Sequence, residues 1–260
     1  LVQRAGRVSF FGQISMMHGM NIPVILETED LVVINKPSGL VVHGDGKHVE
    51  PTVAEWVAER YPESAGVGDP MKIEHQGRTV EVERSGIVHR IDRDTSGCLI
   101  IAKNQEAFEF LKSQFQEHTI KKKYVAVVYG WPRDERGIID QPIGRSPANI
   151  RAWTTKSGSR GMRQAVTRFT VARKFEVDGE KFAVVDLYPQ TGRTHQLRVH
   201  MSHLGHPIVG DPIYAGKRVS PLAISRTALH AERIGFTTPD GKPVEAKAPL
   251  PDDLATLLIS

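Results

Sequence analysis

The chain has 260 residues, 40% of them hydrophobic and 25% charged, which is typical of a soluble globular protein with one large core or two modest domains. No apolar run reaches the ~18 residues that span a membrane, so no membrane partner is expected. No signal-peptide pattern opens the sequence, and the single cysteine, Cys98, excludes an internal disulfide. These features indicate a cytoplasmic protein. The net charge of +4 and the pI of about 9.2 are compatible with a nucleic-acid partner.

The first half of the chain predicts a strand, two helices and a loop. The apolar run 31–36 predicts a buried strand, and Thr52 with Glu55 has the spacing of a capping box that starts a helix. Residues 63–86 carry glycine, proline and charge without a clear period, which predicts a long surface loop. Asn104 caps a second helix with an apolar stripe at helical spacing. The stripe consists of Ala107, Phe108, Leu111 and Phe115.

The second half predicts mostly strands, because β-branched and aromatic residues recur there in short runs. Strands are expected at 124–129, 165–172, 182–187, 228–236 and 243–247. A basic, irregular link occupies 144–163, a helix is expected from Thr194 to Leu204, and a short helix starts near Asp252. The whole pattern is typical of an α+β fold with a mixed, mostly antiparallel sheet.

One segment combines more chemistry than any other. Residues 89–97 (HRIDRDTSG) place three basic side chains, two carboxylates and two hydroxyls between apolar runs. So many polar side chains in one segment make folding less favourable unless they have a function, because an unpaired buried charge costs several kcal/mol. Catalytic side chains often lie on loops between rigid elements. The segment is therefore the first candidate for a reactive site.

This segment resembles the His-Arg-Leu-Asp-x-x-Thr-Ser-Gly motif of the RluA family of pseudouridine synthases, with Ile91 in place of leucine. Residues 35–43 (NKPSGLVVH) resemble the N-terminal motif of that family, and residues 191–200 (TGRTHQLRVH) resemble its C-terminal motif. All three motifs occur in the family's order. The resemblance extends from about Ile25 to about Leu258 and is nearest to the members that modify large-subunit ribosomal RNA.

The resemblance implies a pseudouridine synthase fold, in which a long, mixed, mostly antiparallel central sheet carries flanking helices and an RNA-binding cleft. It implies a catalytic domain over residues 25–260, preceded by an N-terminal segment, 1–24. One interpretation of that segment is a remnant of the small RNA-binding module that often precedes this catalytic domain in the family. The expected partner is structured RNA, ribosomal RNA before tRNA, and a monomer is expected.

The implied reaction needs a carboxylate and no redox or phosphoryl step. Conversion of uridine to pseudouridine breaks the glycosidic bond, turns the uracil and joins its carbon 5 to the ribose, and a carboxylate can act as nucleophile or base. By the resemblance, the essential carboxylate is Asp92, and Arg198 is the arginine that keeps it ionised. The alternative for Asp92 is a purely structural ion pair. The sequence leaves open whether Asp92 attacks the sugar or abstracts a proton.

Tyr124 matches the family tyrosine that stacks on the target uracil and is proposed to help remove the proton at carbon 5. Alternation along its strand places Tyr124, Ala126 and Val128 on one sheet face, so the alternative is a structural tyrosine. The target uridine must leave its stack, and Arg90 and His89 are expected to contact the vacated space.

The resemblance also supplies the expected substrate-binding residues. They are His89, Arg90, Leu197, Lys36, Thr95, Arg193 and His195. Lys36 has two interpretations, since it either contacts phosphate or supports the catalytic loop. Leu197 either packs near the target base or belongs to the core with Met201 and Leu204, which recur at helical spacing.

Basic residues gather in two places that suit a phosphate backbone. The first stretch contains Arg145, Arg151, Lys156, Arg160 and Arg163. The second is the run Lys121, Lys122 and Lys123. The alternative for both is a solvated surface.

No metal and no nucleotide cofactor is expected. Four histidines recur in the C-terminal motif region, at His195, His200, His203 and His206. Their spacing is not the i, i+4 pair of a helical zinc site, and Cys98 lies far away in sequence. No Walker A or G-x-G-x-x-G pattern occurs.

Three functions from different classes are compatible with these features to different degrees. The sequence favours a cofactor-free RNA pseudouridine synthase that acts on 23S ribosomal RNA, with a tRNA enzyme of the same family as the alternative. A non-catalytic RNA-binding factor of ribosome assembly is disfavoured because Asp92, Tyr124 and Arg198 are all present. A metal hydrolase fails on the histidine spacing.

Overall fold

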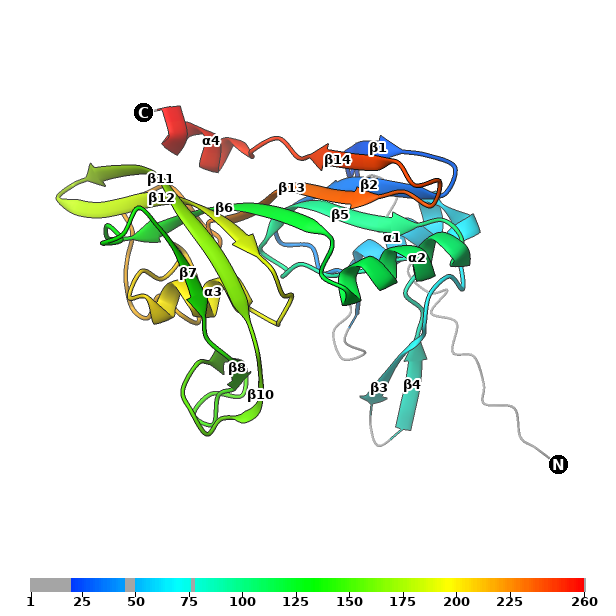
Figure 1. Ribbon diagram of the computed structural model, residues 1–260, viewed down its shortest axis with the longest axis horizontal. Helices are drawn as coiled ribbons and strands as arrows, with labels where there is room; N and C mark the ends of the chain where they lie inside the picture. The colour runs from blue at the N-terminus through cyan, green and yellow to red at the C-terminus, as the bar shows by residue number, and fades with distance from the viewer. Residues whose placement is uncertain (1–19, 45–49, 76–77, 260) are drawn as a thin grey trace.

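The computed structural model describes residues 20–44, 50–75 and 78–259. A nine-stranded sheet forms the centre of the molecule, with the strand order β1-β2-β5-β13-β6-β12-β11-β7 and with β14 paired to β13. All of its described pairings are antiparallel except that of β5 with β13. Figure 1 shows this sheet running along the length of the molecule. The α+β fold with a mixed, mostly antiparallel sheet is confirmed.

A few short helices interrupt the succession of strands along the chain. The sheet strands are β1 (Val24–Glu27), β2 (Leu31–Lys36), β5 (Ser96–Ala102), β6 (Lys121–Tyr129), β7 (Arg136–Asp140), β11 (Val166–Val177), β12 (Glu180–Pro189), β13 (Leu229–Thr237) and β14 (Pro243–Lys247). The helices are α1 (Val53–Arg60), the 3-10 turn η2 (Pro62–Ser64), α2 (Gln105–Gln116), α3 (Gln196–His203) and α4 (Asp252–Ile259). The predicted capping box of α1 is present, with Thr52 accepting from the Glu55 amide.

Strand β5 is buried on both faces, because α1 and α2 cover opposite sides of it. All seven of its residues are buried. Leu99 and Ile101 pack with the residues of α1, whereas Cys98 and Ile100 pack with those of α2. A strand covered on both faces reads as a continuous apolar run. The segment just before β5 is therefore held by rigid structure on both sides.

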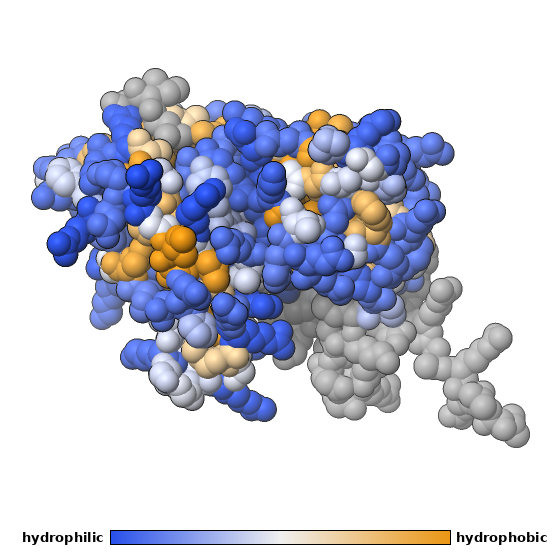
Figure 2. Space-filling view, viewed as in Figure 1, coloured by the Kyte–Doolittle hydropathy of each residue, from blue (hydrophilic) through white to orange (hydrophobic). Residues whose placement is uncertain are grey.

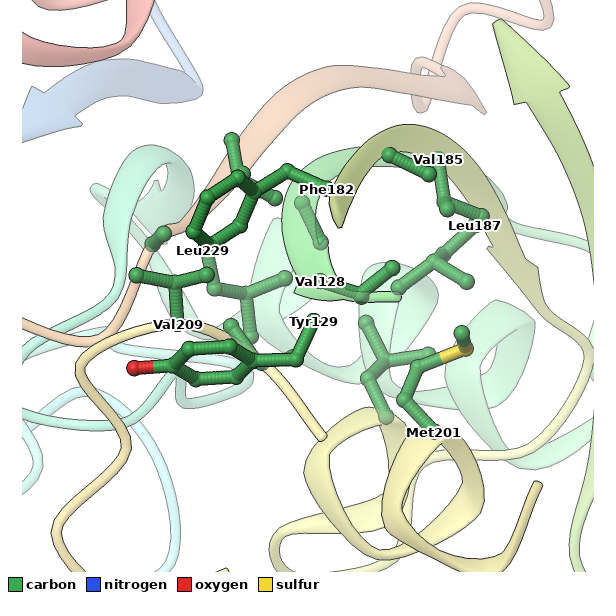
Figure 3. Close-up of a cluster of buried hydrophobic side chains, with 14 of the residues drawn as sticks. Val128, Tyr129, Phe182, Val185, Leu187, Met201, Val209 and Leu229 are labelled. Atoms are coloured by element: carbon green, nitrogen blue, oxygen red, sulfur yellow. The ribbon is translucent and has the colours of Figure 1, made fainter. Parts of the chain in front are cut away.

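The second half of the sheet packs against α3. Figure 3 shows Val128 and Tyr129 of β6 and Phe182, Val185 and Leu187 of β12 gathered over Met201 of α3. Leu197, one turn earlier on α3, belongs to the same core. This packing fixes α3, and with it the C-terminal motif, against the sheet.

Two segments that were predicted to be irregular contain strands. Residues 63–86 include the hairpin of β3 (Met71–His75) and β4 (Arg78–Val82). The basic link 144–163 is part of a small sheet of β8 (Ile143–Arg145), β9 (Trp153–Thr154) and β10 (Arg160–Arg163). Both ribbons project from the main sheet (Figure 1). The loop predictions were wrong because strands this short, with charged and glycine residues, carry little periodic signal.

The domain boundary at residue 24 stays a prediction, since residues 1–19 lie outside the described part of the chain. No helix among the described residues is long and apolar enough to pass through a bilayer. Figure 2 shows that hydrophilic side chains cover most of one face of the molecule.

Candidate active site

A cleft of about 660 Å³ brings the predicted residues together from distant parts of the chain. Nine of the ten predicted site residues line it: His89, Arg90, Asp92, Thr95, Tyr124, Arg193, His195, Leu197 and Arg198. The exception is Lys36. The cleft is formed by the loop before β5, by β6 and by the turn that starts α3.

The loop that carries Asp92 is clamped by the N-terminal motif. The Gly39 amide donates to the Arg93 carbonyl oxygen at 3.0 Å, and the Ser38 hydroxyl donates to the carbonyl oxygen of Asp94 at 2.8 Å. The Thr95 amide closes the turn onto the carbonyl oxygen of Asp92 at 3.1 Å. Two motifs more than fifty residues apart therefore form one rigid unit.

Lys36 supports this loop and does not line the cleft, so its assignment to substrate binding is corrected. Its side chain is fully buried and donates to the carbonyl oxygens of Pro37, Leu40 and Arg93 at 2.7 to 2.8 Å. Burial lowers its pKa to about 7, while the nearby carboxylates of Asp94 and Asp92 oppose that shift. Three carbonyl acceptors match the three protons of an ammonium group. A group enclosed in this way is not available to phosphate.

Gly97 allows β5 to approach β13 closely. Its φ of +113° lies in the region that favours glycine, and an added Cβ would lie 2.2 Å from the Ala231 carbonyl oxygen. The parallel pairing of β5 with β13 passes through Gly97 and Ala231. Gly97 of the central motif therefore has a structural role that requires no contact with substrate.

Asp92 forms an ion pair with Arg198, as the resemblance implied. Arg198 Nη1 donates to Asp92 Oδ2 at 3.0 Å, although the two residues are 106 positions apart. The same guanidinium donates through Nε and Nη2 to Asp211, at 2.6 and 2.9 Å. Burial opposes the charge of Arg198, but the bonds to Asp211 and Asp92 outweigh it and raise the pKa of Arg198. The arginine is therefore a fixed cation beside the Asp92 carboxylate.

Sequence reasoning did not find Asp211. Its side chain has no exposed surface, and its Oδ1 also accepts from the amides of Ile213 and Tyr214, at 2.9 and 3.0 Å. The signal in the sequence was only a turn pattern, glycine-aspartate-proline at 210–212. Such a pattern predicts a turn, and nothing in it predicts an arginine partner.

The turn into α3 is held by a buried glutamine. The Gln196 side chain accepts from the Thr191 hydroxyl and the Arg193 amide, at 2.7 and 3.0 Å, and donates to the Val166 carbonyl oxygen at 3.0 Å. The helix begins later than predicted, because His195 adopts a left-handed conformation with φ of 55°. That conformation directs the chain into the cleft before the first helical turn.

Tyr124 and Leu197 form part of the apolar wall of the cleft. Tyr124 packs against the core cluster of which Leu197 is a member, and both residues line the cleft. Burial, with the Asp92 charge as a second cause, raises the pKa of Tyr124. Its hydroxyl therefore stays protonated at neutral pH. The core and cleft interpretations of Tyr124 and Leu197 are therefore compatible, because each residue packs in the core and also lines the cleft.

The His89 side chain is held by contacts within the protein. Its Nε2 accepts from the Ile100 amide at 3.0 Å, and its ring stacks on Phe115 at 4.6 Å. Burial lowers the pKa of His89 to about 3, so the ring is neutral. Arg90, in contrast, is exposed at the cleft. Of the two, Arg90 is the better placed to contact a displaced base.

The basic stretch forms a second pocket that continues the cleft. It encloses about 500 Å³ and is lined by Ile143, Arg145, Trp153, Arg160, Gly161, Arg163, Gly192, Arg193 and Thr194. The last three of these residues also line the cleft. No carboxylate is among its lining residues, and Arg145 lies over the Trp153 ring at 4.8 Å. The pocket is therefore a concentration of positive charge beside the candidate site.

The three consecutive lysines do not act as one cluster. Lys123 pairs with Asp186 and Glu232, at 3.1 and 2.9 Å. Lys122 lines the cleft, and burial lowers its pKa to about 8. Lys121 is exposed. Alternation along β6 separates neighbours to opposite faces, so only Lys122 is directed to the cleft.

Three of the four histidines of the C-terminal region have separate partners. His200 contacts Thr167 and the Gln141 carbonyl oxygen, His203 contacts Thr155, and His206 contacts the Tyr129 carbonyl oxygen. Over the described residues, no group of three or more histidine, cysteine, aspartate or glutamate side chains is arranged to hold a metal ion.

Comparison with known proteins agrees with the family resemblance of the sequence motifs. The model of the family described as RNA pseudouridylate synthase matches residues 30–203. An uncharacterized RNA pseudouridine synthase of Bacillus subtilis (strain 168), YlyB, is 38% identical, with 92% of this chain and 72% of the relative aligned. The ribosomal large subunit pseudouridine synthase D of Zymomonas mobilis is 36% identical, over 91% of this chain and 71% of the relative.

The structure is also similar to a solved one. Human RNA pseudouridylate synthase domain containing 1 superposes with a TM-score of 0.68 at 28% identity, covering 89% of this chain and 84% of the other. The family model and these relatives identify an enzyme that acts on RNA. The chain belongs to the RNA pseudouridylate synthase family, isomerases that convert uridine to pseudouridine.

Proposed function

We propose that this enzyme modifies uridine in large-subunit ribosomal RNA, with Asp92 as the catalytic carboxylate. The observation that carries the assignment of Asp92 is its ion pair with Arg198 inside the cleft, at 3.0 Å. The choice of ribosomal RNA is supported by relatives such as that of Zymomonas mobilis, whose name refers to the large ribosomal subunit. A tRNA enzyme of the same family is the alternative.

The two oxygens of Asp92 have different surroundings. Oδ2 is held by Arg198, whereas Oδ1 accepts no hydrogen bond from the residues that the structure describes. The free oxygen is then available to attack the ribose or to remove a proton from it, while Arg198 holds the other oxygen in place. Arg198 cannot serve as the acid or base, because its guanidinium stays charged.

The walls of the cleft suit a uracil that has left its stack. Tyr124 offers a ring face and Leu197 an apolar surface on which the base turns between bond breaking and bond forming. With its hydroxyl protonated, Tyr124 takes part in loss of the carbon 5 proton only after giving up its own proton or through its oxygen lone pair. Arg90 is placed to occupy the space that the base vacates.

The RNA backbone is proposed to follow the second pocket out of the cleft. Arg145, Arg160 and Arg163 line that pocket, and Arg193 lies where it joins the cleft. Arg160 and Arg163 form no ion pair with the described residues. Cations without protein partners release counterions from RNA on binding, which makes the affinity dependent on salt.

We expect the enzyme to be a monomer and to work in the cytoplasm.

The test combines a catalytic variant with mapping of modified nucleotides. Total RNA from cells that lack the protein should lose pseudouridine at defined large-subunit positions, and the wild-type gene should restore it. Asp92→Asn should not restore it, although RNA affinity should stay within a few-fold because phosphate contacts hold the RNA. Asp94→Asn is the matched control, since Asp94 lies in the same loop but does not line the cleft.

Restoration by Asp92→Asn would contradict the role of Asp92. Loss of pseudouridine from tRNA and not from ribosomal RNA would favour the alternative target. If the wild-type protein binds RNA but changes no uridine in any RNA, the non-catalytic factor would be the correct assignment.

A further inference from the structure

The Asp92 carboxylate is faced by a second side chain besides Arg198. His195 Nε2 lies 4.0 Å from Asp92 Oδ2, the same oxygen that Arg198 binds. His195 adopts a left-handed backbone conformation, with φ of 55°. A residue other than glycine keeps such a conformation only where its surroundings fix it. The contacts of its side chain therefore matter for where the ring points.

The other ring nitrogen of His195 meets a buried tyrosine. Nδ1 lies 2.9 Å from the Tyr214 hydroxyl, and the Trp153 amide donates to that hydroxyl at 2.9 Å. The two rings meet edge to face, with centroids 5.7 Å apart. A hydroxyl carries one proton, so its use as acceptor from Trp153 leaves that proton free for His195.

Of the two neutral tautomers of His195, only one satisfies all of these contacts. If Nε2 carries the proton of a neutral ring, it faces the Asp92 carboxylate favourably and Nδ1 accepts from Tyr214. The other tautomer would direct a lone pair at the carboxylate and two donors at the Tyr214 oxygen. The partner of one ring nitrogen commonly selects the tautomer in this way.

The charge state of the ring fits this arrangement. Burial lowers the pKa of His195, and Arg198 and Arg90 act in the same direction, while Asp92 and Asp211 oppose them. Burial raises the pKa of Tyr214 to about 12, so its hydroxyl stays a donor at neutral pH. His195 is therefore neutral when the enzyme works, with one proton whose position is set by Tyr214.

Asp211 joins the two groups that face Asp92. Its carboxylate binds Arg198 and also accepts from the Tyr214 amide at 3.0 Å. The Arg198 guanidinium lies 5.2 Å from the centre of the Tyr214 ring. One turn, residues 211–214, thus fixes both the cation and the histidine.

We propose that Tyr214 is a positioning residue, whose hydroxyl holds His195 as the Nε2–H tautomer that faces Asp92. This inference rests on the proposed function of Asp92. With Arg198 bonded to Oδ2 and His195 Nε2 lying 4.0 Å from the same oxygen, Oδ1 is the oxygen presented to the ribose. Tyr214 does not line the cleft and acts through His195. Because the Trp153 amide binds the same hydroxyl, the basic pocket and the catalytic carboxylate share this anchor.

The test compares Tyr214→Phe with Tyr188→Phe, which removes a hydroxyl that lies 3.5 Å from Asp186 on β12 and does not line the cleft. Nitrogen-15 NMR of the histidine rings, with the His195 signals assigned from a His195→Gln variant, should give the Nε2–H pattern in the wild type. Tyr214→Phe should give a mixture of tautomers. In steady-state assays the kcat of Tyr214→Phe should fall roughly tenfold, which is the factor that the loss of one hydrogen bond implies. Its KM for RNA should be unchanged. Tyr188→Phe should change neither.

Two results would overturn the proposal. One is an Nδ1–H pattern for His195 in the wild type. The other is a Tyr214→Phe variant that keeps both the wild-type tautomer and the wild-type kcat. The NMR result decides the position of the proton whether or not the RNA supplied is a substrate. A wild-type protein that isomerises no uridine would instead overturn the proposed function alone.

Discussion

Arg198 binds Asp211 with two nitrogens and leaves one for Asp92. The distances are 2.6 and 2.9 Å to Asp211 and 3.0 Å to Asp92. Asp211 is fully enclosed, whereas the Asp92 side chain keeps 23% of its surface exposed. The arginine therefore has a structural partner and a functional one, and the structural partner determines where the guanidinium lies.

Removal of Arg198 should affect stability and activity together. Arg198→Ala leaves the buried Asp211 carboxylate without its cation, which costs about 3–5 kcal/mol of unfolding free energy. It also removes the cation that holds the Asp92 carboxylate in place, so turnover should be lost. Urea denaturation and single-turnover rates measure the two effects.

A double variant separates these effects. In Arg198→Ala with Asp211→Ala, the uncompensated charge is gone, so much of the lost unfolding free energy should return while activity stays absent. Recovery of activity in the double variant would show that Arg198 has no role in the reaction.

Tyr124→Phe tests whether the ring or the hydroxyl is needed. The ring packs against the core and lines the cleft, so RNA affinity should stay near normal. Loss of the carbon 5 proton should slow, and the rotated intermediate should accumulate. Rapid quenching of a reaction with uridine labelled at carbon 5 detects both. Tyr124→Ala, as the comparison, should weaken binding by about 1–3 kcal/mol because the stacking surface is lost. Full activity of the Phe variant would restrict Tyr124 to stacking.

The basic pocket should set the salt dependence of RNA binding. Arg145, Arg160 and Arg163 line it, whereas Arg151 of the same stretch does not. Alanine at the three lining positions should flatten the slope of log affinity against log salt by about two units, since each phosphate contact adds roughly 0.7–0.9. The turnover at saturating RNA should hardly change.

A control with the same loss of charge makes this result specific. Alanine at Arg133, Arg136 and Lys217 removes three exposed cations that line neither pocket. Equal slopes for the two triple variants would mean that the basic pocket acts only through net charge.

RNA affinity should also fall as the pH rises through about 8. Burial lowers the pKa of Lys122 to about 8, so this cleft lysine is protonated at pH 7 and mostly neutral at pH 9. Bound phosphate favours the protonated form, so the contact is present below that pKa and lost above it. The loss should be roughly fivefold, the value of about 1 kcal/mol for one partly exposed ion pair. The Lys122→Arg variant should show no such loss of affinity, because arginine does not titrate in this pH range. Affinities at constant salt and pH 7, 8 and 9 provide the measurement.

The motifs and the main elements could be predicted because their signals are local. Strand 31–36, the capping box at Thr52 and the Asn104 cap are present in the structure. Tertiary contacts overrode the local pattern elsewhere. The left-handed backbone of His195 delays the start of α3, and short paired strands replace the two expected loops.

The class of chemistry followed from the sequence, because three motifs in the order of a known family imply, by that resemblance, a catalytic carboxylate and its arginine partner in one cleft. Which charged groups meet could be read only from the folded chain. Sheet order places the loop before β5 opposite the start of α3, and burial sends Lys36 to backbone carbonyls and Arg198 to Asp211. Partners of this kind depend on distance in space and on exclusion of water, and neither quantity is written in the spacing of residues along the chain.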